Sequence, residues 1–225
     1  LIAKVKSKRN KILQNDPTIP SDVIQARSMP DSELWETAIQ KEITGLHENK
    51  NCFLLLTDQM KKSEKYRKMK WIPSCMVFKR KINSDGTINK YKARLCAGGH
   101  RQYIGDGSFT ETFAPTAGLL SLRLALTMAV NLGLKPYQLD VEQAFLNNKL
   151  DTDIVMELPK GVNIEGHNHV YLQKGVYGLK QAPAIWYKQC KETILSVAPE
   201  LSCAVSDPCF FHYFGEDRII IMTIC

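Results

Sequence analysis

The feature of this 225-residue chain that most restricts its fold is a pair of strand-like segments joined by a short turn. Residues 75–82 and 88–95 have the composition of strands, and Asn83-Ser84-Asp85-Gly86 lies between them. Asp-Gly is a strong signal for a tight hairpin turn, because both residues tolerate the backbone angles that such turns require. The sequence therefore predicts an antiparallel hairpin.

This hairpin lies in a strongly basic segment. From Lys61 to Arg101 the sequence has thirteen Lys and Arg residues and two acidic ones, a local charge of +11 (13 − 2), whereas the whole chain carries +7. Because strand side chains alternate, Lys90, Lys92 and Arg94 are expected on one face. Such a strip is typical of a surface that binds phosphates, and an ordinary solvated basic face is the alternative.

The remaining pattern mixes helices and strands. Residues 1–30 are polar and contain three prolines, which predicts a linker or extended lead-in. Helical spacing of apolar residues, with Trp35 as a packing residue, predicts helices over 34–46, 119–132 (ended by Gly133) and 182–197. Strands are expected over 135–141, 154–158, 170–173, 209–214 and 218–225, and the last is apolar enough to be central and buried.

Several classes of protein are excluded. No apolar run approaches the roughly 20 residues that span a bilayer, and the first residues do not form a signal peptide, so we expect a protein that is intracellular, cytoplasmic or nuclear, and not secreted. The seven cysteines include no C-x-x-C pair, which argues against a zinc ribbon and a disulfide scaffold and favours reduced thiols. His167 and His169 fit a polar loop better than a metal site.

Asp140 is the main candidate for chemistry. It stands in Gln138-Leu139-Asp140-Val141, near the carboxyl end of the strand expected over 135–141, where side chains can emerge into a cleft. A surface or capping aspartate is the alternative. The motifs around it decide between these interpretations.

Eight motifs between about Trp35 and Cys225 resemble, in type and order, the copia-type retrotransposon reverse transcriptases. They are Trp71-Ile72-Pro73 leading to Phe78-Lys79, Asp85-Gly86, Tyr91-Lys92-Ala93-Arg94-Leu95, Gly99 to Gly105, Glu111-Thr112-Phe113-Ala114-Pro115, Gln138-Leu139-Asp140-Val141, Ala144-Phe145-Leu146-Asn147, and Tyr177-Gly178-Leu179-Lys180-Gln181-Ala182-Pro183 with Trp186-Tyr187. The resemblance implies an α+β right-hand polymerase with fingers over 31–114 and a palm, truncated here, over 115–225.

The resemblance also implies a site for nucleotidyl transfer from a dNTP to a primer 3′-hydroxyl. Two Mg²⁺ ions, for which Mn²⁺ can substitute, would bind the Asp140 carboxylate and the Val141 carbonyl oxygen. Phe145 would be the steric gate against ribose, or else a core residue. The other implied nucleotide contacts are Lys92 and Arg94 on the β and γ phosphates, Tyr177 and Gly178 in the pocket wall, and Lys180 and Gln181, whose alternative is a surface role.

One departure from the family pattern matters. The family places two consecutive metal-binding aspartates just after an apolar strand like Ile219 to Ile224, whereas this sequence ends at Cys225. We therefore expect a fragment of a Pol polyprotein that is inactive alone and works with a primed RNA or DNA template, dNTPs and the missing palm hairpin, thumb, RNase H and integrase. The alternative is a decayed remnant that acts at most as a basic nucleic-acid-binding module.

Overall fold

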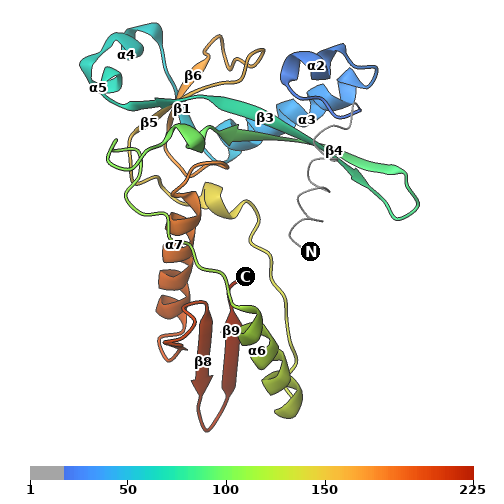
Figure 1. Ribbon diagram of the computed structural model, residues 1–225, viewed down its shortest axis with the longest axis vertical. Coiled ribbons are helices and arrows are strands. Elements are labelled where there is room, and N and C mark those ends of the chain that lie inside the picture. The colour runs from blue at the N-terminus through green and yellow to red at the C-terminus, as the bar shows by residue number, and fades with distance from the viewer. Residues whose placement is uncertain (1–17) are drawn as a thin grey trace.

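The computed structural model describes residues 18–225, which form a larger and a smaller lobe (Figure 1). Most of residues 1–30, the expected lead-in, lie outside the described range, but Val23–Ser28 within it forms a helix that the lead-in prediction missed.

The helices are α2 (Val23–Ser28), α3 (Ser32–Thr44), α4 (Asp58–Lys62), α5 (Glu64–Arg67), α6 (Leu119–Asn131) and α7 (Ala182–Val197), with short helical turns η1 (Gly45–Asn49), η2 (Gly99–Arg101) and η3 (Ala144–Asn147). The strands are β1 (Phe53–Leu55), β2 (Lys70–Ile72), β3 (Ser74–Ile82), β4 (Ile88–Ala97), β5 (Ile154–Glu157), β6 (His169–Leu172), β7 (Ser202–Cys203), β8 (Phe210–Phe214) and β9 (Ile219–Thr223).

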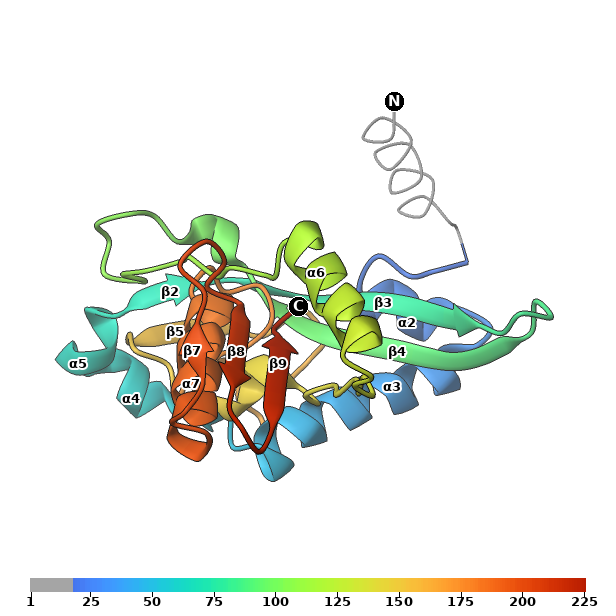
Figure 2. The same cartoon turned by 90° about the horizontal axis from the view of Figure 1, so that it is seen from below.

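The predicted helix over 34–46 and the basic hairpin are both confirmed, and they pack together. Trp35 and Ile39 on one face of α3 are buried, and the Trp35 ring meets Phe78 of β3 and Tyr91 of β4 edge-on, with centroids 5.4 and 4.5 Å apart. Strands β3 and β4 pair along their length and project beyond the lobe (Figures 1 and 2). The packing role expected of Trp35 is therefore confirmed.

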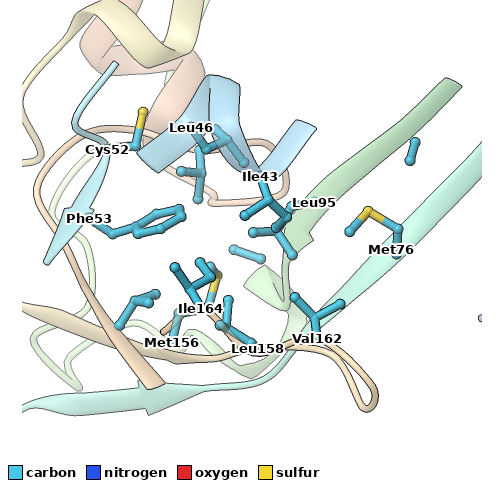
Figure 3. Packing of buried hydrophobic residues seen from close by; sticks show 14 of the residues in the cluster. Ile43, Leu46, Cys52, Phe53, Met76, Leu95, Met156, Leu158, Val162 and Ile164 are labelled. Atoms are coloured by element: carbon cyan, nitrogen blue, oxygen red, sulfur yellow. The ribbon is translucent and has the colours of Figure 1, made fainter. Parts of the chain in front are cut away.

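The core of the larger lobe combines residues from both halves of the chain. Its sheet has the order β1-β6-β5-β2, in which β2 and β5 are parallel and the other pairs antiparallel. Figure 3 shows Ile43, Leu95 and Met156, from α3, β4 and β5, packed in one cluster. Residues near 146–182 thus belong to the lobe that begins the chain, so a single boundary at 114/115 does not separate the two cores.

The smaller lobe consists of α6, α7 and the sheet β7-β8-β9. Its core contains Phe211 of β8 and Ile224, with Trp186 and Ile194 of α7 packed against them. At its edge the carboxylate of Asp207 accepts hydrogen bonds from the backbone N–H of Gly118 (2.9 Å) and of Cys209. This carboxylate caps the start of α6, where Gly118 has no side chain to do so.

Two sequence predictions fail in this lobe. Residues 135–141 form no strand, and β9 is a half-buried edge strand instead of a central one, because in the described chain it pairs with β8 alone. An extended segment without a paired neighbour leaves its backbone groups to water, which does not stabilise a strand. Instead α6, β9 and residues between 134 and 139 line an open apolar groove of about 550 Å³.

Candidate nucleotide-binding site

Three of the predicted site residues meet where β4 ends. The Arg94 guanidinium lies over the Tyr177 ring, 5.1 Å from its centroid, and the Phe145 ring meets Tyr177 edge-on at 5.7 Å. Phe145 comes from η3, which Gln143 starts with a left-handed backbone (φ 52°). A cation on an aromatic face is held in place without losing its charge. The arrangement presents a guanidinium beside two aromatic rings.

A half-buried carboxylate lies close to the basic residues Lys92 and Arg94 of β4. Glu42 on α3 accepts a hydrogen bond from the backbone N–H of Leu95 (3.0 Å), and burial raises the pKa of its carboxyl group. Burial lowers the pKa of Lys92, and repulsion from Arg94 lowers it further. Glu42 and Lys92 line a pocket of about 290 Å³ together with Gln143. An anion placed near Lys92 would relieve this crowding of positive charge.

The wall of the site is a close contact between two backbones. The Ala97 N–H donates to the carbonyl oxygen of Tyr177 (2.7 Å), which holds residues 177 and 178 against the end of β4. A Cβ on Gly178 would collide with the Ala97 carbonyl oxygen, and one on Gly99 would collide with the Gly178 carbonyl oxygen. Gly178 also has a φ of +90°, which favours glycine. The contact therefore requires glycine at both positions.

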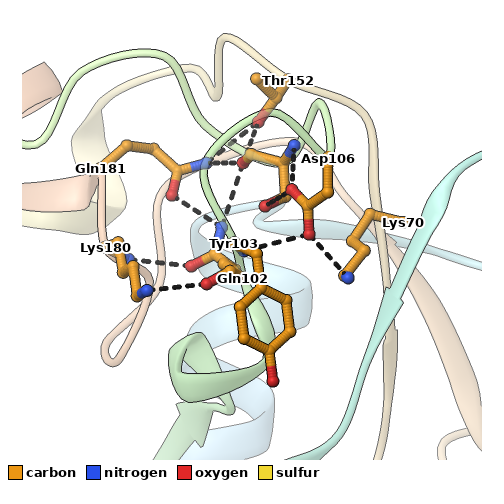
Figure 4. A network of polar contacts seen from close by, with 8 residues as sticks. Lys70, Gln102, Tyr103, Asp106, Thr152, Lys180 and Gln181 are labelled. Carbon is orange, nitrogen blue, oxygen red and sulfur yellow. Dashed lines mark hydrogen bonds and ion pairs between the residues drawn. The ribbon is translucent and has the colours of Figure 1, made fainter.

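Lys180 and Gln181, both predicted to lie beside nucleotide or template, form hydrogen bonds with other residues of the protein (Figure 4). Gln181 is fully buried: its amide donates to the Ser108 carbonyl oxygen (2.8 Å) and accepts from the amide of Gln102 (3.0 Å). The side-chain oxygen of Gln102 also accepts a hydrogen bond from the Lys180 backbone N–H (2.9 Å). The backbone carbonyl oxygen of Gln102 accepts one from Lys180 Nζ (2.7 Å). Gln181 is thus neither a surface residue nor exposed to a ligand.

An ion pair fastens the loop that carries this network. Asp106 binds Lys70 Nζ at 2.7 Å and accepts hydrogen bonds from the backbone N–H groups of Tyr103 and Ser108 (Figure 4). The Lys70 ammonium, followed by the Ser108 hydroxyl, holds the pKa of Asp106 well below its usual range. The loop from Gly98 to Ser108 is therefore tied both to β2 and to the turn at residues 177–181.

Comparison with known proteins identifies the family. A profile described as reverse transcriptase (RNA-dependent DNA polymerase) matches residues 60–224. The chain belongs to this reverse transcriptase family. It is 34% identical over 216 residues to the retrovirus-related Pol polyprotein from transposon TNT 1-94 of Nicotiana tabacum. The aligned region is 95% of this chain and 15% of that polyprotein. It is 40% identical over 150 residues to the Pol polyprotein from transposon RE1 of Arabidopsis thaliana, and this aligned region is 66% of this chain and 10% of the relative.

These relatives confirm the resemblance to copia-type reverse transcriptases. The Pol polyprotein from transposon RE2 of Arabidopsis thaliana is 42% identical over 150 residues, again 66% of this chain and 10% of the relative. The chain thus spans 15% or less of the length of these three relatives. Within residues 18–225 no helix is long and apolar enough to cross a membrane.

The expected metal ligands of this chain, Asp140 and Val141, belong to no cluster of metal-binding side chains among the described residues. Asp140 and Val141 are exposed, in the segment that forms no strand. In the described part of the chain, no three His, Cys, Asp or Glu side chains gather as a metal would require. A Mg²⁺ ion takes near-octahedral oxygen ligands, so one carboxylate and one carbonyl do not make a site for two ions. His167 and His169 hold no such cluster either, and the His169 ring packs on Trp71.

Sequence reasoning missed Glu42 and Gln102. Glu42 falls on the apolar stripe of α3, beside Ile39, Ile43 and Leu46, and an acidic residue on a buried face signals a specific polar partner. Gln102 has no comparable signal, because nothing in a loop sequence indicates that a glutamine there is fully buried. The partners of both residues come from distant parts of the chain.

Proposed function

We propose that this chain forms the fingers and part of the palm of an RNA-directed DNA polymerase from a retrotransposon Pol polyprotein. The enzyme would be intracellular and would add dNTPs to the 3′-end of a primer on an RNA or DNA template. The observation that carries the proposal is the meeting of Arg94, Tyr177 and Phe145 beside Gly178. A planar guanidinium suits phosphate oxygens, and glycine lets a nucleotide approach the backbone.

In this proposal each residue contributes a separate contact. Arg94 and Lys92 bind the β and γ phosphates, and the edge of Phe145 leaves no room for a ribose 2′-hydroxyl. Tyr177 keeps Arg94 in place through the ring contact of 5.1 Å. Because Lys180 and Gln181 are bonded to Gln102, we assign them to holding the wall at residues 177–178 instead of to contact with the nucleotide.

Two-metal nucleotidyl transfer requires carboxylates in addition to Asp140. The open groove beside β9 and the unpaired edge of that strand are where a further strand would fit, and such a strand would bring its residues close to the segment that carries Asp140. We propose that the two consecutive aspartates of the family pattern reach the site in this way. The metal ions, with the Val141 carbonyl oxygen as a further ligand, would then bind only in the larger protein.

The gate role predicts a change in sugar selectivity. In a polymerase that contains this chain and the missing carboxylates, Phe145→Val should raise the use of ribonucleotides relative to dNTPs by roughly 10- to 200-fold, the range of steric discrimination in a pocket. The measurement is the ratio of kcat/KM for the two sugars on one primed RNA template. This ratio does not depend on the fraction of active enzyme, so unchanged discrimination would refute the gate even if Phe145→Val is less stable.

A second function, sequence-independent nucleic-acid binding, is favoured by charges on the hairpin. Lys79 faces Lys92, and Lys81 faces Lys90, directly across the two strands, and in the described chain none of the four forms an ion pair. Like charges in such positions repel and destabilise a hairpin. A polyanion lying along this face would offset the repulsion.

The hairpin charges can be tested by salt dependence. Lys81→Ala combined with Lys90→Ala should weaken binding of a primed duplex and reduce the slope of log K against log salt by about 2, one for each lost phosphate contact. Fluorescence anisotropy at several salt concentrations measures this. The matched control is Lys188→Ala with Lys191→Ala on α7, which should leave the slope unchanged. An equal effect of both pairs would mean that the hairpin is not the binding surface.

A further inference from the structure

Two cysteines face each other across the base of the basic hairpin. Cys75 of β3 is the direct partner of Cys96 of β4. Alternation places both thiols on the face that carries Lys79, Lys92 and Arg94. Cys75 is exposed and Cys96 is half-buried, so a small oxidant can reach the pair from solution.

Backbone contacts of the neighbouring residues define the geometry of this pair. The N–H of Leu95 donates to Glu42 and that of Ala97 to Tyr177, so both point away from β3. The N–H of Cys96, which lies between them, therefore points toward β3, and Cys75 and Cys96 form a hydrogen-bonded pair. In such pairs the Cα atoms lie about 5.5 Å apart, within the range of about 4.4–6.8 Å that a disulfide spans.

We propose that Cys75 and Cys96 form a reversible cross-strand disulfide, a redox modification site whose oxidant is a low-molecular-weight disulfide such as oxidised glutathione. The inference goes beyond the polymerase function and does not depend on it. The Cβ atoms of facing residues are about 4.5–5.5 Å apart, with hydrogen-bonded pairs at the wider end, and a disulfide draws them to about 3.8 Å. The resulting bond is strained and therefore easily reduced, as regulatory disulfides are.

The reaction proceeds by two exchanges. The exposed Cys75 attacks as a thiolate, the bond of oxidised glutathione breaks, and one glutathione leaves and takes up the proton that Cys75 gave up. Cys96 then loses its proton and attacks Cys75 Sγ, which releases the second glutathione. In total two protein thiols lose two electrons and two protons, and one small disulfide gains them. Cys75 reacts first because it is exposed, whereas Cys96 is half-buried and burial raises the pKa of its thiol to about 11.

Oxidation would fasten the hairpin next to the candidate site. Cys96 lies between Leu95 and Ala97, whose N–H groups hold the contacts to α3 and to Tyr177. A bond from Cys96 to β3 would restrict movement of this part of β4 relative to the hairpin. The disulfide form should therefore exchange the backbone hydrogens around residues 74–77 and 94–97 more slowly than the thiol form.

The test is peptide mapping by mass spectrometry after the folded chain has been equilibrated in glutathione redox buffers. We expect a cross-linked peptide pair containing Cys75 and Cys96, lighter by two hydrogen atoms and separated again by dithiothreitol. Cys75→Ser and Cys96→Ser should each abolish it, whereas Cys190→Ser, on α7 in the other lobe, should leave it intact. Glutathione attached to Cys75 without a cross-link, or an unreacted pair, would overturn the proposal, and circular dichroism of each variant shows that it is folded.

Discussion

Gly178→Ala is expected to destabilise the protein by about 3 kcal/mol or more, because the new methyl group meets two obstacles. Its Cβ would collide with the Ala97 carbonyl oxygen, and the φ of +90° is strained for any residue with a side chain. Neither obstacle yields easily, since the Ala97 N–H is itself bonded to Tyr177 across the same contact. The measurement is urea unfolding followed by tryptophan fluorescence, which reports on Trp35 and Trp71 in the larger lobe and on Trp186 in the smaller one.

Two further alanine variants separate the two causes. Gly86→Ala, in the turn of the hairpin, has a similar φ of +87° but open space around its Cβ, so it should cost only about 1 kcal/mol. Gly99→Ala lacks the positive φ but would collide with the Gly178 carbonyl oxygen, so it should cost more than Gly86→Ala. If Gly86→Ala and Gly178→Ala shift the unfolding midpoint equally, the backbones of residues 97 and 178 are not in close contact.

Two elements that the sequence predicted correctly, the β3–β4 hairpin and α3, have signals that lie close together along the chain. The β3–β4 hairpin depends on the Asp85-Gly86 turn and on alternation within two adjacent strands. Helix α3 depends on the spacing of Trp35, Ile39 and Ile43 along one face. Both signals lie within about 20 residues of sequence, where periodicity is a direct consequence of local geometry.

The predictions that failed concern a segment that has no paired strand and a strand with one open edge. Residues 135–141 have the apolar composition of a strand, yet composition does not supply a neighbour, and no strand in residues 18–225 pairs with them. β9 is apolar enough to be central, but one of its edges is open. Alternation predicts a strand, whereas pairing between segments far apart in sequence decides whether the strand forms and how deeply it is buried.

In the candidate site too, the sequence indicates which residues to consider, and the fold decides where their side chains lie. Arg94, Phe145 and Tyr177 were singled out by motif, and the structure brings their side chains together although they lie up to 83 residues apart (177 − 94). Gln181 was singled out in the same way, and it is buried against Gln102. Motif resemblance thus selected residues that lie close together in the fold. It does not distinguish a residue that faces a ligand from one that holds the wall in place.

Asp140→Asn is expected to abolish primer extension by the proposed polymerase. An amide removes the negative charge that binds a divalent cation but keeps nearly the same shape, so binding and folding should survive while the chemical step is lost. The loss should be at least as large as the roughly 100- to 1,000-fold that follows removal of one preorganised transition-state contact. Because Asp140 is exposed and forms no hydrogen bond or ion pair with the described residues, the change should leave the unfolding midpoint of this chain unaltered.

The control for Asp140→Asn is Asp217→Asn, which makes the same chemical change at an exposed position in the turn between β8 and β9. Asp217→Asn should retain full primer extension. Single-turnover rates on a primed RNA template with Mg²⁺ measure the chemical step, and primer-template affinity measured without dNTP shows whether binding is intact. Loss of synthesis with unchanged affinity and stability would place Asp140 at the reacting centre. Substantial synthesis by Asp140→Asn would mean that this carboxylate does not bind the metal, and the assignment of the whole segment at 138–141 would fail with it.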